Sequence, residues 1–199
     1  MVKRLVIYSP CFENPYLPWS GRPRDDTLKF VDIFKKFINY YSKYSIFLSY
    51  PCPETASMGI PRPPSTKDVY SKIPIVIEIA KNIVEYIENV VNRINPDLIV
   101  FVGKLGSPLC GAKYTTYSDG NYTPDIVLTK KFRKALELKE NFTLKKEPGI
   151  LFDFVKEKFP NAVYCDLSFK DAKSLVEQLR WIVRHLQLDD YEFFDTITL

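Results

Sequence analysis

The sequence predicts an α/β protein, a Rossmann-like three-layer sandwich in which helices cover both faces of a mostly parallel sheet. Short apolar runs, typical of buried strands, alternate along the chain with longer stretches whose apolar residues recur at helical spacing. Alternation of this kind is typical of parallel sheets. The length of 199 residues suits one domain, so we expect a single α/β domain over residues 1–199, with a C-terminal α/β portion over 123–199.

Four apolar runs are the predicted strands: "KRLVIYS" (3–9), "YSIFLSY" (44–50), "PDLIVFVG" (96–103) and "NAVYCD" (161–166). The first two open into proline-rich loops, and the third is followed by a long loop from Lys104 to about Thr123. These loops are the places where we expect functional residues, because open parallel sheets bind their ligands beyond the carboxyl ends of the strands.

The predicted helices lie between and after these strands. The first begins near Thr27 with Asp25 and Asp26 as cap residues, and its apolar residues are Phe30, Phe34, Phe37, Ile38 and Tyr41. The second begins at Pro74, and its stripe consists of Val76, Ala80, Ile83, Ile87, Val90 and Ile94. Further along come an apolar segment at 125–128 and helical patterns near 129–140 and 149–159. The last helix places Ala172, Leu175, Leu179, Ile182 and Leu186 on one face.

Composition limits the classes of function. A formal charge of +4 permits contact with RNA without requiring it. The N-terminal apolar run is too short for a signal peptide and no stretch is long enough to span a membrane, so we expect a cytoplasmic protein in which the sequons at Asn121 and Asn141 are accidental. The composition, rich in lysine, isoleucine and tyrosine, is thermophile-like.

Three of the four cysteines follow predicted strands. Cys11, Cys52 and Cys110 come after the first, second and third strand, whose ends lie at the same edge of a parallel sheet, so the thiols are expected to converge. Soft sulfur ligands select zinc, copper(I) or iron–sulfur clusters. Four possibilities stay open on the residues alone: a cluster with one open iron, a zinc site, a disulfide, or three unligated thiols.

The residues around these cysteines favour one of the four possibilities for the thiols. The motifs "SPC" (9–11), "CPETASMGIPRP" (52–63) and "KLGSPLCG" (104–111), in this order and each after a strand, resemble the thiouracil desulfurase family. "YSDG" (117–120) is also similar to that family, and the resemblance covers about residues 5–122.

The resemblance implies a [4Fe-4S] cluster held by Cys11, Cys52 and Cys110. It implies an iron-dependent enzyme in which the open iron captures the thiocarbonyl sulfur of a thiolated uracil or uridine, and water replaces that sulfur without net redox change. Glu54 and Ser107 match the family's catalytic pair: the carboxylate would shuttle a proton, and the hydroxyl would position the water or protonate the base. Ser9 and Arg62 are the expected substrate-binding residues.

The sequence departs from the family pattern after the first cysteine. "WSGRPRDD" replaces the usual R-Y-D-G element, so that Arg24 and Asp25 are approximate counterparts, and Leu109 replaces a small polar residue. These differences concern the choice of substrate: we expect a thiolated nucleobase or nucleoside, with a thiolated base in tRNA or another thio-compound as the alternatives.

Each candidate residue also has a simpler structural interpretation. Glu54 could be a solvated turn carboxylate, Ser107 a cap for a loop amide and Arg62 part of a surface ion pair. Cys165 is expected to be a buried inert thiol rather than a fourth ligand, and His185 a partner of a helix C-terminus.

Two further interpretations concern the partners and the class of protein. The basic run "KKFRK" (130–134) is expected to be a solvated face, with tRNA contact as the alternative. The main rival to an enzyme is a cluster- or zinc-binding sulfur carrier or sensor, which would not need Glu54 and Ser107 beside the thiols.

Overall fold

A computed structural model describes residues 2–17, 25–60, 62, 65–118, 142–169, 172–189, 191–195 and 197. Several sequence predictions lie outside these residues. They are the apolar segment and helical pattern over 125–140 with its basic run, the sequons at Asn121 and Asn141, and the position of Arg24.

The chain forms the following elements in order. The strands are β1 (Arg4–Tyr8), β2 (Ile46–Ser49), β3 (Leu98–Lys104), β4 (Thr115–Ser118), β5 (Phe142–Lys145) and β6 (Val163–Leu167). The helices are η1 (Pro10–Phe12), α1 (Asp25–Tyr41), α2 (Pro53–Met58), α3 (Lys67–Tyr70), α4 (Pro74–Ile94), α7 (Ile150–Lys158), α8 (Ala172–His185) and α9 (Tyr191–Asp195).

Four strands form an all-parallel sheet in the order β2–β1–β3–β6. In β1 and β3 side chains alternate between two buried faces, as expected for a parallel sheet covered on both sides. Val6 pairs with Val100, and Val102 pairs with Cys165, so that apolar side chains line up across the sheet. The predicted α/β fold with a mostly parallel sheet is therefore confirmed.

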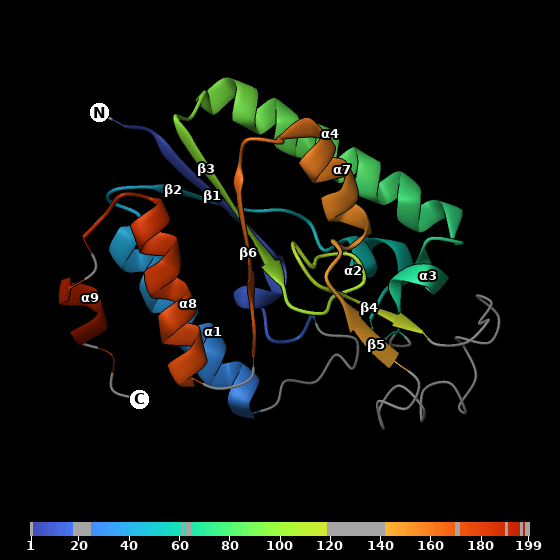
Figure 1. Cartoon of the computed structure of the whole chain (residues 1–199), viewed down its shortest axis with the longest axis horizontal. Coiled ribbons are helices and arrows are strands. Elements are labelled where there is room, and N and C mark those ends of the chain that lie inside the picture. The colour runs from blue at the N-terminus through green and yellow to red at the C-terminus, as the bar shows by residue number, and fades with distance from the viewer. Residues whose placement is uncertain are drawn as a thin grey trace.

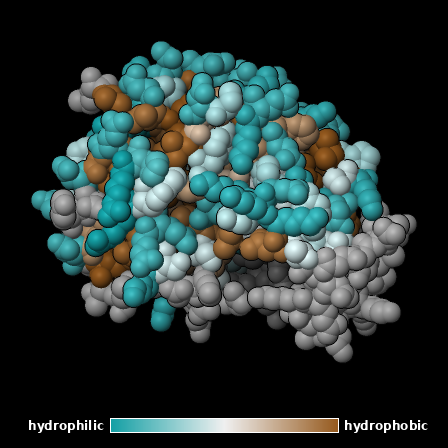
Figure 2. All heavy atoms as spheres, viewed as in Figure 1, coloured by the Kyte–Doolittle hydropathy of each residue, from teal (hydrophilic) through white to brown (hydrophobic). Residues whose placement is uncertain are grey.

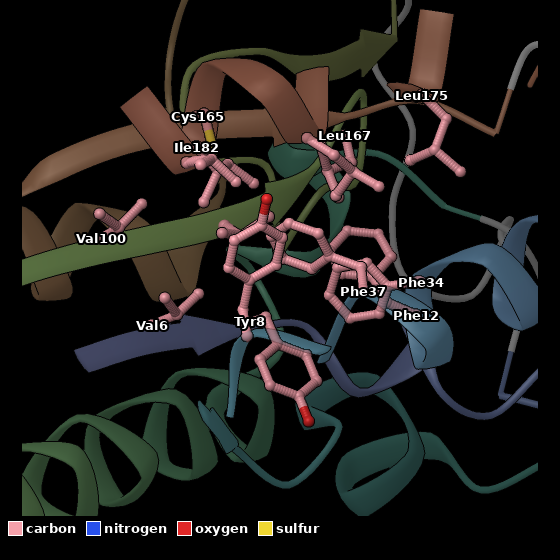
Figure 3. Close-up of a cluster of buried hydrophobic side chains, with 14 of the residues drawn as sticks. Val6, Tyr8, Phe12, Phe34, Phe37, Val100, Cys165, Leu167, Leu175 and Ile182 are labelled. Carbon is pink, nitrogen blue, oxygen red and sulfur yellow. The ribbon is translucent and has the colours of Figure 1, made fainter. Parts of the chain in front are cut away.

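Each face of the sheet has its own hydrophobic core. Helices α1, α8 and α9 cover one face, and α4 and α7 cover the other (Figure 1). Figure 3 shows the first of these cores, to which Val6 of β1 and Val100 of β3 belong and in which Tyr8 of β1 packs against Phe34 of α1, with ring centroids 5.2 Å apart. The periodic apolar residues predicted for the first and last helices lie largely in this core.

Helix α4 differs in detail from the predicted stripe. Val76, Ala80, Ile83 and Ile87 are buried as expected, but farther along the helix Val91 is buried more deeply than Val90. Apolar residues three or four positions apart can both continue the buried stripe of a helix, so the spacing alone allows either Val90 or Val91 to be buried. The packing of α4 against the sheet and α7 buries Val91.

Several short elements were not predicted from the sequence, among them η1 and α9. Helices α2 and α3 lie in the region expected to be a proline-rich loop. Strands β4 and β5 pair in a separate antiparallel two-stranded sheet, in which Thr115 lies opposite Lys145. Helix α7 confirms the helical pattern predicted over 149–159.

The surface in Figure 2 is mainly hydrophilic, with apolar side chains showing in small areas between polar ones. Among the described residues, none of the helices has the length and apolarity that crossing a membrane requires.

Candidate active site

The candidate site lies where the chain reverses its direction of winding across the sheet. From β1 the chain passes through α1 on one face to the edge strand β2, whereas from β3 it passes through α7 on the other face to the opposite edge strand β6. The carboxyl ends of the neighbouring strands β1 and β3 thus form a topological switch point, the usual place for a ligand crevice. A cavity of about 210 Å³ lies among the loops that follow β1, β2 and β3.

All the residues predicted for the site line this one cavity: Ser9, Cys11, Cys52, Glu54, Arg62, Ser107 and Cys110. They come from three loops far apart in the sequence. The expected convergence of the three cysteine loops is therefore present in the structure.

The three cysteines occupy different local positions. Cys11 lies in η1 directly after β1, Cys52 is the N-cap of α2, and Cys110 lies in the loop after β3. The Thr55 amide donates to Cys52 Sγ at 3.5 Å, so this thiol takes the part that a serine or aspartate usually plays at a helix start. All the cysteines of the chain, each among the described residues, are free thiols, and no disulfide joins them.

Burial and mutual repulsion disfavour bare thiolates in this cavity. Burial raises the pKa of the Cys110 thiol well above its ordinary value, and negative charge at Cys52 and Glu54 adds to the rise. Burial also raises the pKa of Cys11, although the Lys104 charge and the Ser9 hydroxyl oppose it. Ser9 Oγ lies 3.2 Å from Cys11 Sγ. Three thiolates at this site therefore require compensating positive charge.

Glu54 and Arg62 form an ion pair at the wall of the cavity. Arg62 Nε and Nη2 donate to Glu54 Oε2 at 2.9 and 2.7 Å. The Arg62 side chain is 3% exposed and that of Glu54 is 14% exposed, so this is not the surface salt bridge that was one interpretation. Burial lowers the pKa of Arg62, but the Glu54 charge and its hydrogen bonds, together with weaker contributions from Cys52 and Tyr70, outweigh burial, so the net pKa is raised and the guanidinium stays cationic.

Two further N–H groups of Arg62 are also used within the protein. Nη1 donates to Thr55 Oγ1 at 3.3 Å and Nη2 donates to the Leu17 carbonyl at 3.0 Å. The guanidinium therefore joins the second cysteine loop to the first. These contacts fix the Glu54 carboxylate relative to both loops.

Ser107 connects the same carboxylate to the third cysteine loop. Its hydroxyl donates to Glu54 Oε1 at 3.3 Å and accepts a hydrogen bond from the Cys110 amide at 2.9 Å. The cap for a loop amide and the partnership with Glu54, which were alternative interpretations, are thus both present. Because Oε2 is held by Arg62 at shorter distances, Oε1 is the carboxylate oxygen more available to a ligand.

Sequence reasoning missed two residues that serve the site. Lys104, the first residue of "KLGSPLCG", lies at the end of β3, lines the cavity and lowers the pKa of Cys11 against the effect of burial. Asp166 of β6 accepts hydrogen bonds from the amides of Ala112, Lys113 and Tyr114, and so fastens the segment that follows Cys110. The sequence did offer one indication of Asp166, because this residue ends the predicted strand "NAVYCD" and polar residues at strand ends often serve the site.

Gly103 allows this fastening. A Cβ at this position would lie 2.4 Å from the Ala112 amide nitrogen, 2.5 Å from the Cys110 carbonyl oxygen and 2.6 Å from Asp166 Oδ1. Glycine is therefore required for the third cysteine loop to return so closely against the sheet.

Two residues expected to have no catalytic part lie away from this cavity. Cys165 lies within the hydrophobic core between β6 and α8, where burial raises the pKa of its thiol (Figure 3). His185, in the last turn of α8, stacks on Trp181 with ring centroids 3.6 Å apart, and its Nδ1 donates to the Trp181 carbonyl at 2.8 Å.

Comparison with known protein families adds to this geometry. The model of the family described as "Putative 2-thiouracil desulfurase" matches residues 2–185, which extends well beyond the motif region at 5–122 and includes β6 and α8. No curated protein and no solved structure matches the chain. Because the family model covers most of the sequence, the chain belongs to the 2-thiouracil desulfurase family.

Proposed function

We propose that this protein is a desulfurase that replaces the thiocarbonyl sulfur of a thiolated pyrimidine with oxygen, and that it depends on a [4Fe-4S] cluster held by Cys11, Cys52 and Cys110. The observation that carries the proposal is that three thiols and the Glu54–Ser107 pair share one cavity at the switch point of the sheet. A thiolated nucleobase or nucleoside is the proposed substrate, with a thiolated base in tRNA as a larger form of it. Family membership supports this substrate class.

The donor set suits a cluster better than a single ion. Among the described residues, no group of three or more His, Cys, Asp or Glu side chains is arranged to hold one metal ion. Ligands of a single ion must nearly touch one another, whereas the thiolates of a cluster each bind a separate iron and lie farther apart. The three thiols interact electrostatically across the cavity, and iron would supply the positive charge that their thiolate forms require.

When bound through three thiolates, such a cluster offers one open iron as a Lewis acid with affinity for sulfur. The protein's own residues supply the acid–base chemistry. In this proposal Glu54 Oε1 accepts a proton from the water that attacks the thiocarbonyl carbon, and the hydrogen bond from Ser107 to this oxygen supports that role. Arg62 keeps the carboxylate in place through Oε2. Overall, C=S and water become C=O and hydrogen sulfide, without oxidation or reduction.

The test measures iron, sulfide and turnover together. Protein purified and reconstituted without oxygen is expected to contain iron and sulfide, and to release sulfide from 2-thiouracil catalytically. Glu54→Gln and Ser107→Ala are expected to retain the iron but to lower the rate of sulfide release about 10²- to 10⁴-fold, the usual contribution of a general acid–base group. Glu157→Gln, on the exposed side of α7, is the matched control and should leave the rate unchanged.

Two results would contradict the proposal. A colourless protein with stoichiometric zinc and no iron would eliminate the cluster. An iron-loaded protein that releases at most one sulfide per chain, with both variants equal to the wild type, would instead support the sulfur carrier or sensor. We prefer the enzyme to the sulfur carrier or sensor because a carrier does not require the Glu54–Ser107 pair beside the thiols.

A further inference from the structure

Tyr50 has a buried hydroxyl for which the described residues provide no hydrogen bond. The residue follows β2 directly and precedes Cys52 by two positions, and its side chain is 1% exposed. Its hydroxyl oxygen is shielded from solvent and has no hydrogen-bond partner in the part of the chain that the structure describes. An unsatisfied buried hydroxyl is costly, and a phenylalanine would fill nearly the same space without this cost.

The surroundings of this hydroxyl show which partner it lacks. It faces the Cys110 thiol, with the Ser9 hydroxyl and Cys11 nearby, without reaching normal hydrogen-bond geometry to any of them. The hydroxyl of Ser9 is already in contact with Cys11 Sγ. Tyr50 is therefore a donor whose best available acceptor is the sulfur of Cys110.

A neutral thiol is a poor acceptor, but a thiolate is a strong one. We propose that Tyr50 is a positioning residue that donates a hydrogen bond to the Cys110 sulfur when that sulfur is a thiolate ligand of the cluster. The inference rests on the proposed function, because it requires the ligated form of Cys110. It explains why an uncompensated hydroxyl lies beside the third cysteine loop.

This hydrogen bond has two measurable consequences. A donor to a ligand sulfur withdraws negative charge and raises the reduction potential of an iron–sulfur cluster. It also stabilises the loaded protein more than the metal-free protein, because the donor finds its acceptor only in the loaded form. The two effects distinguish this role from simple packing of an aromatic ring.

The experiment compares Tyr50→Phe with Tyr164→Phe. Tyr164 is the matched control because its hydroxyl donates to the Phe159 carbonyl at 2.7 Å, away from the thiols. In metal-free protein, Tyr50→Phe is expected to melt at the same temperature as the wild type or higher, and Tyr164→Phe to melt lower. After reconstitution with iron and sulfide, Tyr50→Phe is expected to show a lower reduction potential and several-fold faster release of iron to a chelator, whereas Tyr164→Phe keeps both values of the wild type.

The outcomes separate this inference from the proposed function. If reconstituted Tyr50→Phe has the potential and the iron-release rate of the wild type, the role of Tyr50 is overturned while the desulfurase proposal stands. If the wild type takes up no iron and sulfide, both are overturned. If metal-free Tyr50→Phe is destabilised as much as Tyr164→Phe, the hydroxyl has a partner in the protein itself and the inference also fails.

Discussion

At the scale of single residues, which side chains line the cavity was predictable from the sequence, but the hydrogen bonds among them were not. Three cysteines were predicted to converge because each follows a strand, Glu54 and Ser107 were expected from the resemblance to the desulfurase motifs, and all five line the cavity. The sequence could not show that Arg62, eight residues after Glu54, returns to hold one of its carboxylate oxygens. It also gave no sign that Tyr50 lies beside Cys110, since that contact joins loops sixty residues apart.

The Arg62–Glu54 pair leads to a prediction about stability. Arg62→Leu is expected to lower the free energy of unfolding of the metal-free protein by about 3–5 kcal/mol, because it leaves the largely buried Glu54 carboxylate without its counter-charge. Urea denaturation measures this loss. Lys36→Leu, which removes the exposed pair of Lys36 with Asp32 on α1, is the control and should cost about 0.5 kcal/mol or less. Equal losses in the two variants would show that Glu54 does not depend on Arg62.

At the scale of elements, periodicity identified the sheet and the long helices, and failed where elements are short or pair over long distances. Helix α2 has six residues, too few for a long apolar stripe, and its N-cap is a cysteine rather than a usual capping residue, although Pro53 and Glu54 in its first turn are typical of a helix start. Strands β4 and β5 are separated by the residues from 119 to 141, so the sequence contains no short hairpin turn that would predict their pairing. Short elements of this kind take their shape from tertiary contacts.

One of these contacts joins α3 to β4 and predicts a dependence on pH. The Asp68 carboxylate accepts hydrogen bonds from the amide of Ser118, at 3.0 Å, and from its hydroxyl. Burial alone would raise the pKa of Asp68, but these hydrogen bonds outweigh it and lower the pKa below 3.8. Because the folded protein favours the charged carboxylate, the stabilisation is complete above the ordinary pKa and is lost as the pH falls below it through the folded value.

Asp68→Asn is therefore expected to reduce stability near neutral pH and to make the decline of stability below pH 4 shallower. The free energy of unfolding measured by urea denaturation between about pH 6 and pH 2 checks this. Ser118→Ala removes one of the donors and should reduce the same slope in part. A slope in Asp68→Asn as steep as that of the wild type would assign the acid sensitivity to other carboxylates.

At the scale of the whole molecule, the strand order accounts for the site. The order β2–β1–β3–β6 places the ends of β1 and β3 side by side, with β2 next to β1, so the three cysteine loops meet although the sheet is otherwise apolar. The sequence predicted this meeting because any parallel arrangement brings strand ends to one edge. Cys165 shows the limit of that reasoning: the sequence placed it near the end of the fourth strand, whereas it lies in the middle of β6 and its side chain is buried in the core with residues of α8.

The strand order thus predicts that the four cysteines separate into two groups when each is replaced. Cys11→Ser, Cys52→Ser and Cys110→Ser are each expected to abolish or strongly reduce iron retention after anaerobic reconstitution, because each thiol lines the same cavity from a different loop. Cys165→Ala is expected to retain the wild-type iron content, and instead to lower the free energy of unfolding by about 1–2 kcal/mol through the gap left in the core. Iron analysis of the four variants, with urea denaturation of Cys165→Ala, checks both parts. Loss of iron in Cys165→Ala at unchanged stability would place a fourth thiol at the site, against the side-chain direction that β6 imposes.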